Sequence, residues 1–367
     1  MKRFTIRKVA LMLTLVFAAP TFAQTSAETG TQINAQANNG SLSSTQAGSF
    51  VTQAPDTSTS QSLSQHIADL SYQAQDKTLD SAQRAKALRE LAQYPNQNAL
   101  VAVARGLKDQ DAEIREAAVI AAEPYGIEYR WRLLSPLLND ADHSVRVTSG
   151  ANLVRDYQRL EPVQQQQLSR PIAELIDYLK PQQESSSRVL LADVYRWQGE
   201  WQQADVIYQA LLATQPDNRQ IWLSLADNYR AQELDKAALE TLNSAIHRVP
   251  ANALENAPLH YSKALTLVRL ERTEEAAQEM ATAASLAKDN SYYWYLNGVL
   301  QEPINVKTAT SSFEKAYLIS GAPEQLYALC DIYLRYDNAK GTQCLAELEK
   351  IAPPYVIEKL KTSRSES

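Results

Sequence analysis

The sequence predicts an all-α protein, an α-solenoid built from helix-turn-helix repeats. Three observations lead to this fold class. From about Ser64 onward the chain is rich in Ala and Leu and lacks the alternating β-branched runs of strands. One pattern recurs in equal steps at Asp80, Asp111 and Asp142, and a second, slightly longer period follows in the other half of the chain. Such periods are typical of arrays whose units bury their apolar faces only against their neighbours.

The segment Met1–Ala23 has the pattern of a secretory signal peptide. A basic start, Met1–Lys8, is followed by an apolar run from Val9 to Ala19 and a small-residue site ending at Ala23. The run is shorter than the roughly 20 residues that a membrane anchor needs, so we expect cleavage near Ala23, with uncleaved anchoring as the alternative. This start is typical of bacteria. It predicts a periplasmic protein, or one outside the cell if it is exported further, with no stable membrane insertion.

Residues 24–62 predict a disordered linker, because Ser, Thr, Gln, Asn, Ala and Gly cannot bury enough apolar surface to offset the entropy of ordering. The formal net charge of the chain is −6, and loss of the four basic residues of the predicted signal peptide makes it more negative still. An acidic chain argues against nucleic acid or anionic lipid as the main partner, since phosphate binding requires a basic face.

The first period gives three copies of one unit within residues 63–160. Each copy has an Asp, an Arg four positions later and then a small residue: Asp80, Arg84 and Ala87; Asp111, Arg115 and Ala118; Asp142, Arg146 and Ser149. We call this unit the aspartate–arginine repeat. Each Asp can cap the following helix by accepting backbone N–H bonds, and each Arg lies on the same helix face. The pattern resembles HEAT-type repeats. A junction at residues 161–184 follows, in which two prolines mark a boundary and a short helix is expected from Ile172 to Lys180.

The second period covers residues 185–354 and gives about five units, the last of them degenerate and expected to act as a cap. The first unit contains Leu191, Ala192, Tyr195, Gly199, Ala204, Tyr208 and Pro216, and the second has Leu225, Ala226, Tyr229, Glu233, Ala238, Leu242 and Pro250 in the same places. This resembles the tetratricopeptide repeat, a helix-turn-helix of about 34 residues. The resemblance implies a right-handed solenoid in which small residues such as Ala192 and Ala204 meet where paired helices approach. It also places Trp294 in the repeat core, and residues 355–367 remain as a C-terminal tail.

The two cysteines, Cys330 and Cys344, occupy the small-residue positions of the first and second helices of the last unit. In this repeat those two positions contact each other. In an oxidising compartment such a pair predicts a disulfide. The alternative is two buried thiols that merely pack.

The sequence has no recognisable motif for catalysis or for cofactor binding. The ten glycines are too far apart for a dinucleotide fingerprint or a phosphate loop, and the four histidines have no zinc-protease or haem-attachment context. Asp140, Asp142 and His143 are clustered and could bind a cation. The equivalent residues of the preceding unit are Asp109, Asp111 and Ala112, so the two acids recur without the histidine. This recurrence indicates that the acids belong to the turn of the repeat. We expect no enzyme activity, no cofactor and no metal.

The tetratricopeptide resemblance implies that the first helices of successive units line a concave groove, which would bind a protein or peptide partner. The residues that it places there are Val189, Asp193, Arg196, Trp197, Leu223, Asp227, Arg230, Tyr261, Leu265, Arg269, Tyr292, Tyr295, Val299, Tyr327, Asp331 and Arg335. Tyr and Arg are enriched at interfaces. The alternative, that the tyrosines only pad adjacent helices, stays open. Val189 and Asp193 stand where domains that grip a C-terminal carboxylate have Lys and Asn, so an acidic tail is not the expected partner.

These observations predict a non-enzymatic periplasmic scaffold or adaptor that binds a partner protein. A structural component of an envelope assembly or polysaccharide-export system is the alternative. The order of the two repeat types also resembles the C-terminal module of some secreted multihaem cytochromes. Because the chain has no haem-attachment motif, that resemblance implies at most an accessory role beside periplasmic cytochromes or respiratory complexes.

Overall fold

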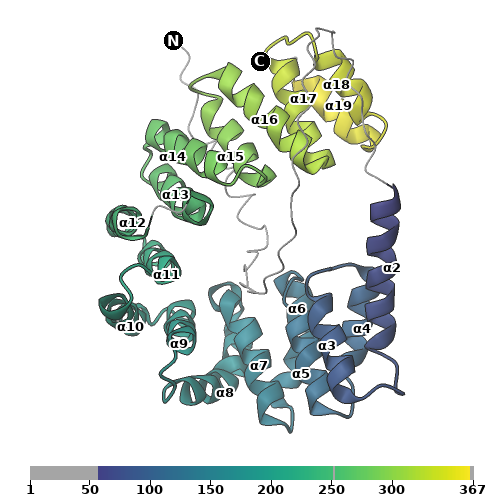
Figure 1. Cartoon of the computed structure of the whole chain (residues 1–367), viewed down its shortest axis with the longest axis vertical. Coiled ribbons are helices and arrows are strands. Elements are labelled where there is room, and N and C mark those ends of the chain that lie inside the picture. The colour runs from purple at the N-terminus through teal and green to yellow at the C-terminus, as the bar shows by residue number, and fades with distance from the viewer. Residues whose placement is uncertain (1–56, 251–252, 364–367) are drawn as a thin grey trace, which may run out of the picture. The chain divides into compact units, whose positions relative to one another are not determined.

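The computed structural model describes residues 57–250 and 253–363 (Figure 1). Within these residues there are eighteen α-helices, two short 3₁₀-helices and no strand, which confirms the all-α repeat fold. The chain divides into two compact units, residues 1–178 and 179–367. The predicted signal peptide and most of the predicted linker lie outside the described residues. No helix in the described part of the chain is both long and apolar enough to cross a bilayer.

The first unit consists of helices that pack on others nearby along the chain. They are α2 (Thr57–Gln73), α3 (Ser81–Leu91), α4 (Gln97–Gly106), α5 (Ala112–Ala121), α6 (Ile127–Leu134), η1 (Ser135–Asn139), α7 (His143–Leu153), η2 (Val154–Arg159) and α8 (Pro162–Leu179). The predicted linker reached residue 62, but α2 already begins at Thr57. Once a helix is nucleated, adding a residue costs little, so polar residues can extend it beyond the apolar segment that composition detects.

The predicted helix caps are confirmed. The side chain of Asp80 accepts a hydrogen bond from the backbone N–H of Gln83, that of Asp111 from Glu113, and that of Asp142 from both Ser144 and Val145. The small residues that follow the arginines are at most 2% exposed. They lie on α3, α5 and α7, of which α3 packs on α5 and α5 packs on α7.

The arginines of the aspartate–arginine repeat make a connection that the sequence pattern did not reveal. Arg84 donates to Asp109 at 2.6 Å, Arg115 donates to both carboxylate oxygens of Asp140 at 2.8 Å, and Arg146 donates to Glu174 at 3.0 Å. Each guanidinium thus binds an acid almost one repeat further along the chain. These ion pairs join each repeat to the one that follows it.

The helix expected at Ile172–Lys180 is longer than predicted. α8 begins at Pro162 and continues through Pro171. Leu168, Ile172, Leu175 and Leu179 are at most 3% exposed and follow each other at helical spacing across the proline. Pro171 also packs against Gly150, where an added Cβ would lie 2.8 Å from the proline ring. Burial of this stripe outweighs the backbone hydrogen bond that the proline removes.

The second unit is a series of helix pairs. The first helices of the pairs are α9 (Ser185–Gln198), α11 (Arg219–Ala231), α13 (Ala253–Arg269), α15 (Ser291–Gln301) and α17 (Pro323–Arg335). The second helices are α10 (Trp201–Thr214), α12 (Asp235–Arg248), α14 (Thr273–Leu286), α16 (Val306–Ser320) and α18 (Gly341–Leu348). Each helix packs on the next one along the chain, and α11 also contacts α9 and α13, so these first helices lie side by side (Figure 1).

The small residues predicted for the crossings of the helix pairs are buried. Ala192, Ala204, Ala226 and Ala238 are fully buried. In the fourth pair the small residue is Gly298, where a Cβ would come within 2.8 Å of the Phe313 ring. The close approach of α15 to α16 therefore requires glycine.

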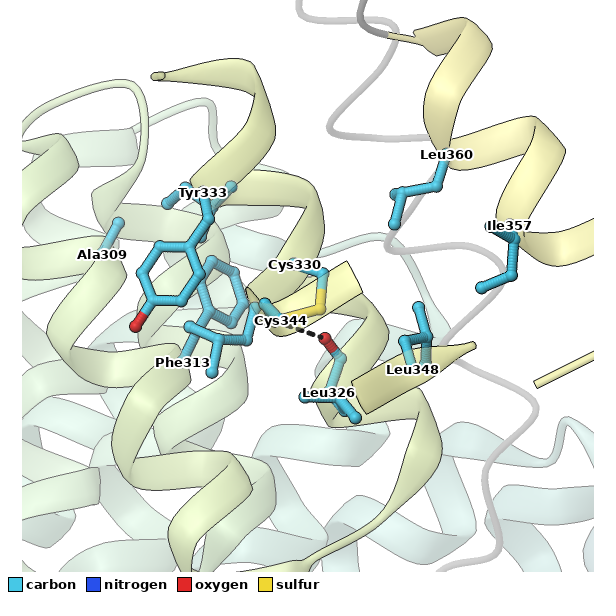
Figure 2. Close-up of a cluster of buried hydrophobic side chains, with 11 residues drawn as sticks. Ala309, Phe313, Leu326, Cys330, Tyr333, Cys344, Leu348, Ile357 and Leu360 are labelled. Atoms are coloured by element: carbon cyan, nitrogen blue, oxygen red, sulfur yellow. Dashed lines mark hydrogen bonds between the residues drawn. A yellow bond between two sulfur atoms is a disulfide. The ribbon is translucent and has the colours of Figure 1, made fainter. Parts of the chain in front are cut away.

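The C-terminal repeat has its own core (Figure 2). The sulfur atoms of Cys330 on α17 and Cys344 on α18 are 2.06 Å apart, at disulfide-bond distance. A further helix, α19 (Pro354–Ser363), replaces most of the predicted tail at 355–367. Its residues Ile357 and Leu360 are buried in the same cluster as the cysteines, because the last pair would otherwise expose an apolar face.

The first-helix face as a candidate functional site

The residues predicted to line a groove lie on α9, α11, α13, α15 and α17. We call them, together with the side chains that they contact, the first-helix face. All the predicted members are half-buried apart from two. Leu265 is only 9% exposed and belongs to the core, whereas Arg269 is exposed. The apolar character of Leu265 therefore serves packing within the third pair and does not form a contact surface.

On α9, Asp193 and Arg196 form a half-buried ion pair with a nitrogen–oxygen distance of 2.9 Å. The hydroxyl of Tyr208 on α10 donates to the same carboxylate oxygen at 2.6 Å. Burial alone would lower the pKa of Arg196, but the charges of Asp193 and Asp227 outweigh it and raise that pKa. The guanidinium also lies 5.5 Å from the ring of Trp197. Arg196 is thus held by its own repeat and lies within reach of the charge on α11.

On α11, Asp227 and Arg230 repeat this pairing one unit later. Arg230 also donates to the backbone carbonyl of Ser262 on α13 at 3.3 Å. The two partners differ in accessibility, because the side chain of Asp227 is 40% exposed and that of Arg230 only 19%. The arginine is therefore used to join α11 to α13, and the carboxylate is the more accessible member.

A cluster of three tyrosines joins α13 to α15. Tyr261 stacks on Tyr293 with ring centroids 4.9 Å apart and meets Tyr292 edge to face at 6.4 Å. We call these three residues the tyrosine cluster. Burial raises the pKa of Tyr293 to about 12 and also raises that of Tyr292 and Tyr261, so all three phenols are neutral at physiological pH.

Tyr293 was not among the predicted groove residues. The sequence signal was present in the run of four aromatics at 292–295, but the repeat resemblance assigned only Tyr292 and Tyr295 to the groove. Tyr293 reaches the face because its ring lies flat against Tyr261 of the preceding unit.

Tyr295 and Tyr327 lie nearer the core of the C-terminal repeat. Tyr295 meets the buried ring of Phe313 at 5.7 Å, and both tyrosines pack against the cluster around the disulfide. Burial raises the pKa of both phenols. Much of each ring is therefore used to pad adjacent helices.

The remaining two arginines are also engaged within the chain. Arg335 donates to Asp331 at 2.7 Å and to both oxygens of Glu302 at the end of α15. Arg269, the last residue of α13, donates to Asp235 at 2.5 Å. All four predicted arginines thus bind carboxylates of this chain, which differs from the expectation that they point to a partner.

Trp294 differs in part from its prediction. Like Trp222 two repeats earlier in the array, it donates its indole N–H to a backbone carbonyl at 2.8 Å. Trp222 is 9% exposed, but Trp294 is only half-buried and carries the ammonium group of Lys315 at 4.0 Å from its ring. It occupies the repeat position without being a core residue.

No three His, Cys, Asp or Glu side chains gather as a metal site in residues 57–250 and 253–363. The acids of the turn at 140–142 have other partners. Asp140 receives two hydrogen bonds from Arg115, and Asp142 caps α7. Their arrangement belongs to the repeat, as the preceding unit indicated.

No protein family matches the chain, and no curated protein matches it by sequence. Solved structures that resemble it include MamA, at 16% identity and a TM-score of 0.37, covering 48% of this chain and 98% of that one. YrrB, described as a TPR protein with an unusual peptide-binding site, has 18% identity and a TM-score of 0.39 over 52% of this chain and 97% of its own. PilF of Pseudomonas aeruginosa has 13% identity and a TM-score of 0.40 over 59% and 97%. These scores are too low to carry an argument, so the fold assignment rests on the chain's own helix pairs.

Proposed function

We propose that this protein is a non-catalytic scaffold of the bacterial periplasm, which binds an extended segment of a partner protein along the first-helix face. The observation that carries the proposal is the tyrosine cluster. Three half-buried phenols from two neighbouring repeats lie together on this face, beside an accessible carboxylate. Tyrosine provides large, rigid contact area and hydrogen-bonding hydroxyls at low entropic cost, which is why it is enriched at binding hot spots.

The cellular location in this proposal follows from two features. The basic and apolar start of the sequence is typical of an exported protein, and the cysteine pair is at bonding distance, as expected in an oxidising compartment. The HEAT-like character of the first unit is part of the same proposal. The helix caps made by its aspartates and the ion pairs between its repeats favour a rigid first unit.

Crosslinking in intact periplasm followed by capture of the full chain tests this function. We expect a defined partner that is captured by the wild type and lost with a Tyr261→Ala and Tyr292→Ala double variant. A Tyr72→Ala variant is the matched control, because Tyr72 is 76% exposed on α2 in the other unit. Circular dichroism verifies that each variant is folded. Equal capture by all three proteins would contradict the proposal and direct attention to the second helices or the first unit.

A further inference from the structure

The ion pair beside the tyrosine cluster exposes its carboxylate more than its guanidinium. Arg230 donates to the backbone carbonyl of Ser262, the residue directly after Tyr261, so the Asp227–Arg230 pair lies next to the cluster. The pKa of Tyr261 reflects the same neighbourhood. Burial raises it, and the charges of Arg230 and Asp227 act on it in opposite directions. Since Arg230 is 19% exposed and Asp227 is 40% exposed, a partner meets the carboxylate first.

The carboxylate of Asp227 also keeps capacity for another donor. Arg230 binds its Oδ1 atom, whereas an ionised carboxylate offers about four lone-pair sites on two oxygens. The comparably exposed cation of the face, Arg269, lies two turns after Tyr261 on α13, which is about 12 Å along a helix, and it is paired with Asp235. It does not compensate the charge of Asp227 beside the cluster.

We propose that the partner segment carries a lysine or arginine whose charged group binds to the Asp227 carboxylate and the phenols of Tyr261 and Tyr292. This inference rests on the proposed function and adds the chemistry of the partner. Aromatic faces attract cations through their quadrupoles, and phenol oxygens accept hydrogen bonds from ammonium or guanidinium groups. An anionic segment is disfavoured here, because every arginine predicted for this face already binds a carboxylate of the chain.

Three pools of short peptides, each about a dozen residues long, test the inference. They are random at all positions except the centre, which is arginine in the first pool, the neutral isostere citrulline in the second and glutamate in the third. Each pool is arrayed and probed with the full chain, and the best binders are measured in solution by fluorescence anisotropy at physiological salt. We expect binders to be concentrated in the arginine pool. Replacement of the central arginine by citrulline should weaken binding by about fivefold or more.

Variants of the protein locate the interaction. Asp227→Asn should abolish the difference between arginine and citrulline peptides, and Asp227→Glu should keep it. Asp217→Asn removes the same charge from an exposed position between α10 and α11 and should change nothing. Tyr292→Leu should weaken binding of the arginine peptides. If Asp227→Asn does not fold, the Asp227→Glu and Tyr292→Leu variants carry the test.

The outcomes separate the inference from the function on which it rests. Peptides that bind equally with arginine and citrulline, yet lose affinity with Tyr292→Leu, would overturn the cationic partner while the first-helix face remains a binding site. A preference for arginine that survives Asp227→Asn would also overturn it. Failure of every pool to bind would overturn both the cationic partner and binding of extended segments.

Discussion

At the scale of single residues, Arg115 shows how the aspartate–arginine repeat is held together. Its guanidinium donates to both oxygens of Asp140 at 2.8 Å and to the backbone carbonyls of Asp109 and Gln110 at 2.9 Å. A single side chain thus hydrogen-bonds to the turn of its own repeat and to the turn of the next repeat. The hydrogen bonds from Arg115 are the main cause of the lowered pKa of Asp140, and burial opposes them.

The lowered pKa of Asp140 predicts a dependence of stability on pH. A depressed carboxyl pKa stabilises the fold above the unfolded value of about 3.9, and this contribution is lost as pH falls through the lower folded pKa. We expect Asp140→Asn to reduce the free energy of unfolding by about 2 kcal/mol at neutral pH. Urea titrations from neutral to acidic pH should show a smaller loss of stability on acidification for Asp140→Asn than for the wild type.

Glu128→Gln is the control for this measurement, because Glu128 is exposed at the start of α6 in the same unit. Its stability curve should run parallel to that of the wild type. Parallel curves for Asp140→Asn as well would show that the ion pair with Arg115 contributes nothing to the acid sensitivity.

At the scale of elements, the turns between paired helices differ in backbone strain. Gly199 has a φ of 85° between α9 and α10, and the same turn in the next two repeats has Glu233 at 61° and Glu271 at 58°. The left-handed backbone conformation costs little for glycine but about 1–2 kcal/mol for other amino acids. The left-handed conformation is therefore required by the geometry of the repeat, because it occurs with glycine and with glutamate alike.

Substitution at these turns should therefore act in opposite directions. We expect Glu233→Gly to raise the free energy of unfolding by about 0.5–1 kcal/mol, since relief of strain exceeds the extra entropy of glycine in the unfolded chain. Gly199→Ala should lower it by about 1 kcal/mol. Urea denaturation followed by circular dichroism measures both. A destabilised Glu233→Gly variant would mean that the glutamate makes a compensating interaction.

At the scale of the whole molecule, contacts are local in sequence in both units. Helices pack on near neighbours along the chain, and ion pairs and ring contacts link one repeat to the next. Stability in such an array is close to a sum over units and their interfaces, so opening at one end need not spread.

The disulfide allows a test of this local behaviour. We expect a Cys330→Ala and Cys344→Ala double variant to lose about 3 kcal/mol of stability in the C-terminal repeat, as for closure of a loop of this size. Hydrogen exchange should become faster in α18 and α19 and stay unchanged in α3 to α7. Wild-type protein treated with a reductant should show the same pattern. Faster exchange throughout the chain would indicate a cooperative fold instead of an array.

Several features could be read from the sequence because they depend on neighbours along the chain. The capping aspartates, the small residues at helix crossings and the cysteine sites follow from the two sequence periods, and the structure has them where the periods place them. The errors lie where packing overrides local signals. Pro171 is inside a helix because of a buried stripe, and the tail at 355–367 is largely a helix because the last repeat requires a cover.

What the sequence alone determined was the repeat architecture, since helix periodicity and capping act over only a few residues. What tertiary structure decided was the use of each polar side chain. The sequence shows Asp and Arg at groove positions, but only the packed repeats show that Arg230 binds across to α13 while Asp227 stays accessible. Likewise, Tyr293 joins the face through its ring contact with Tyr261. The physical reason is that a guanidinium or an aromatic ring binds whatever partner lies within a few ångströms, and that partner belongs to another repeat.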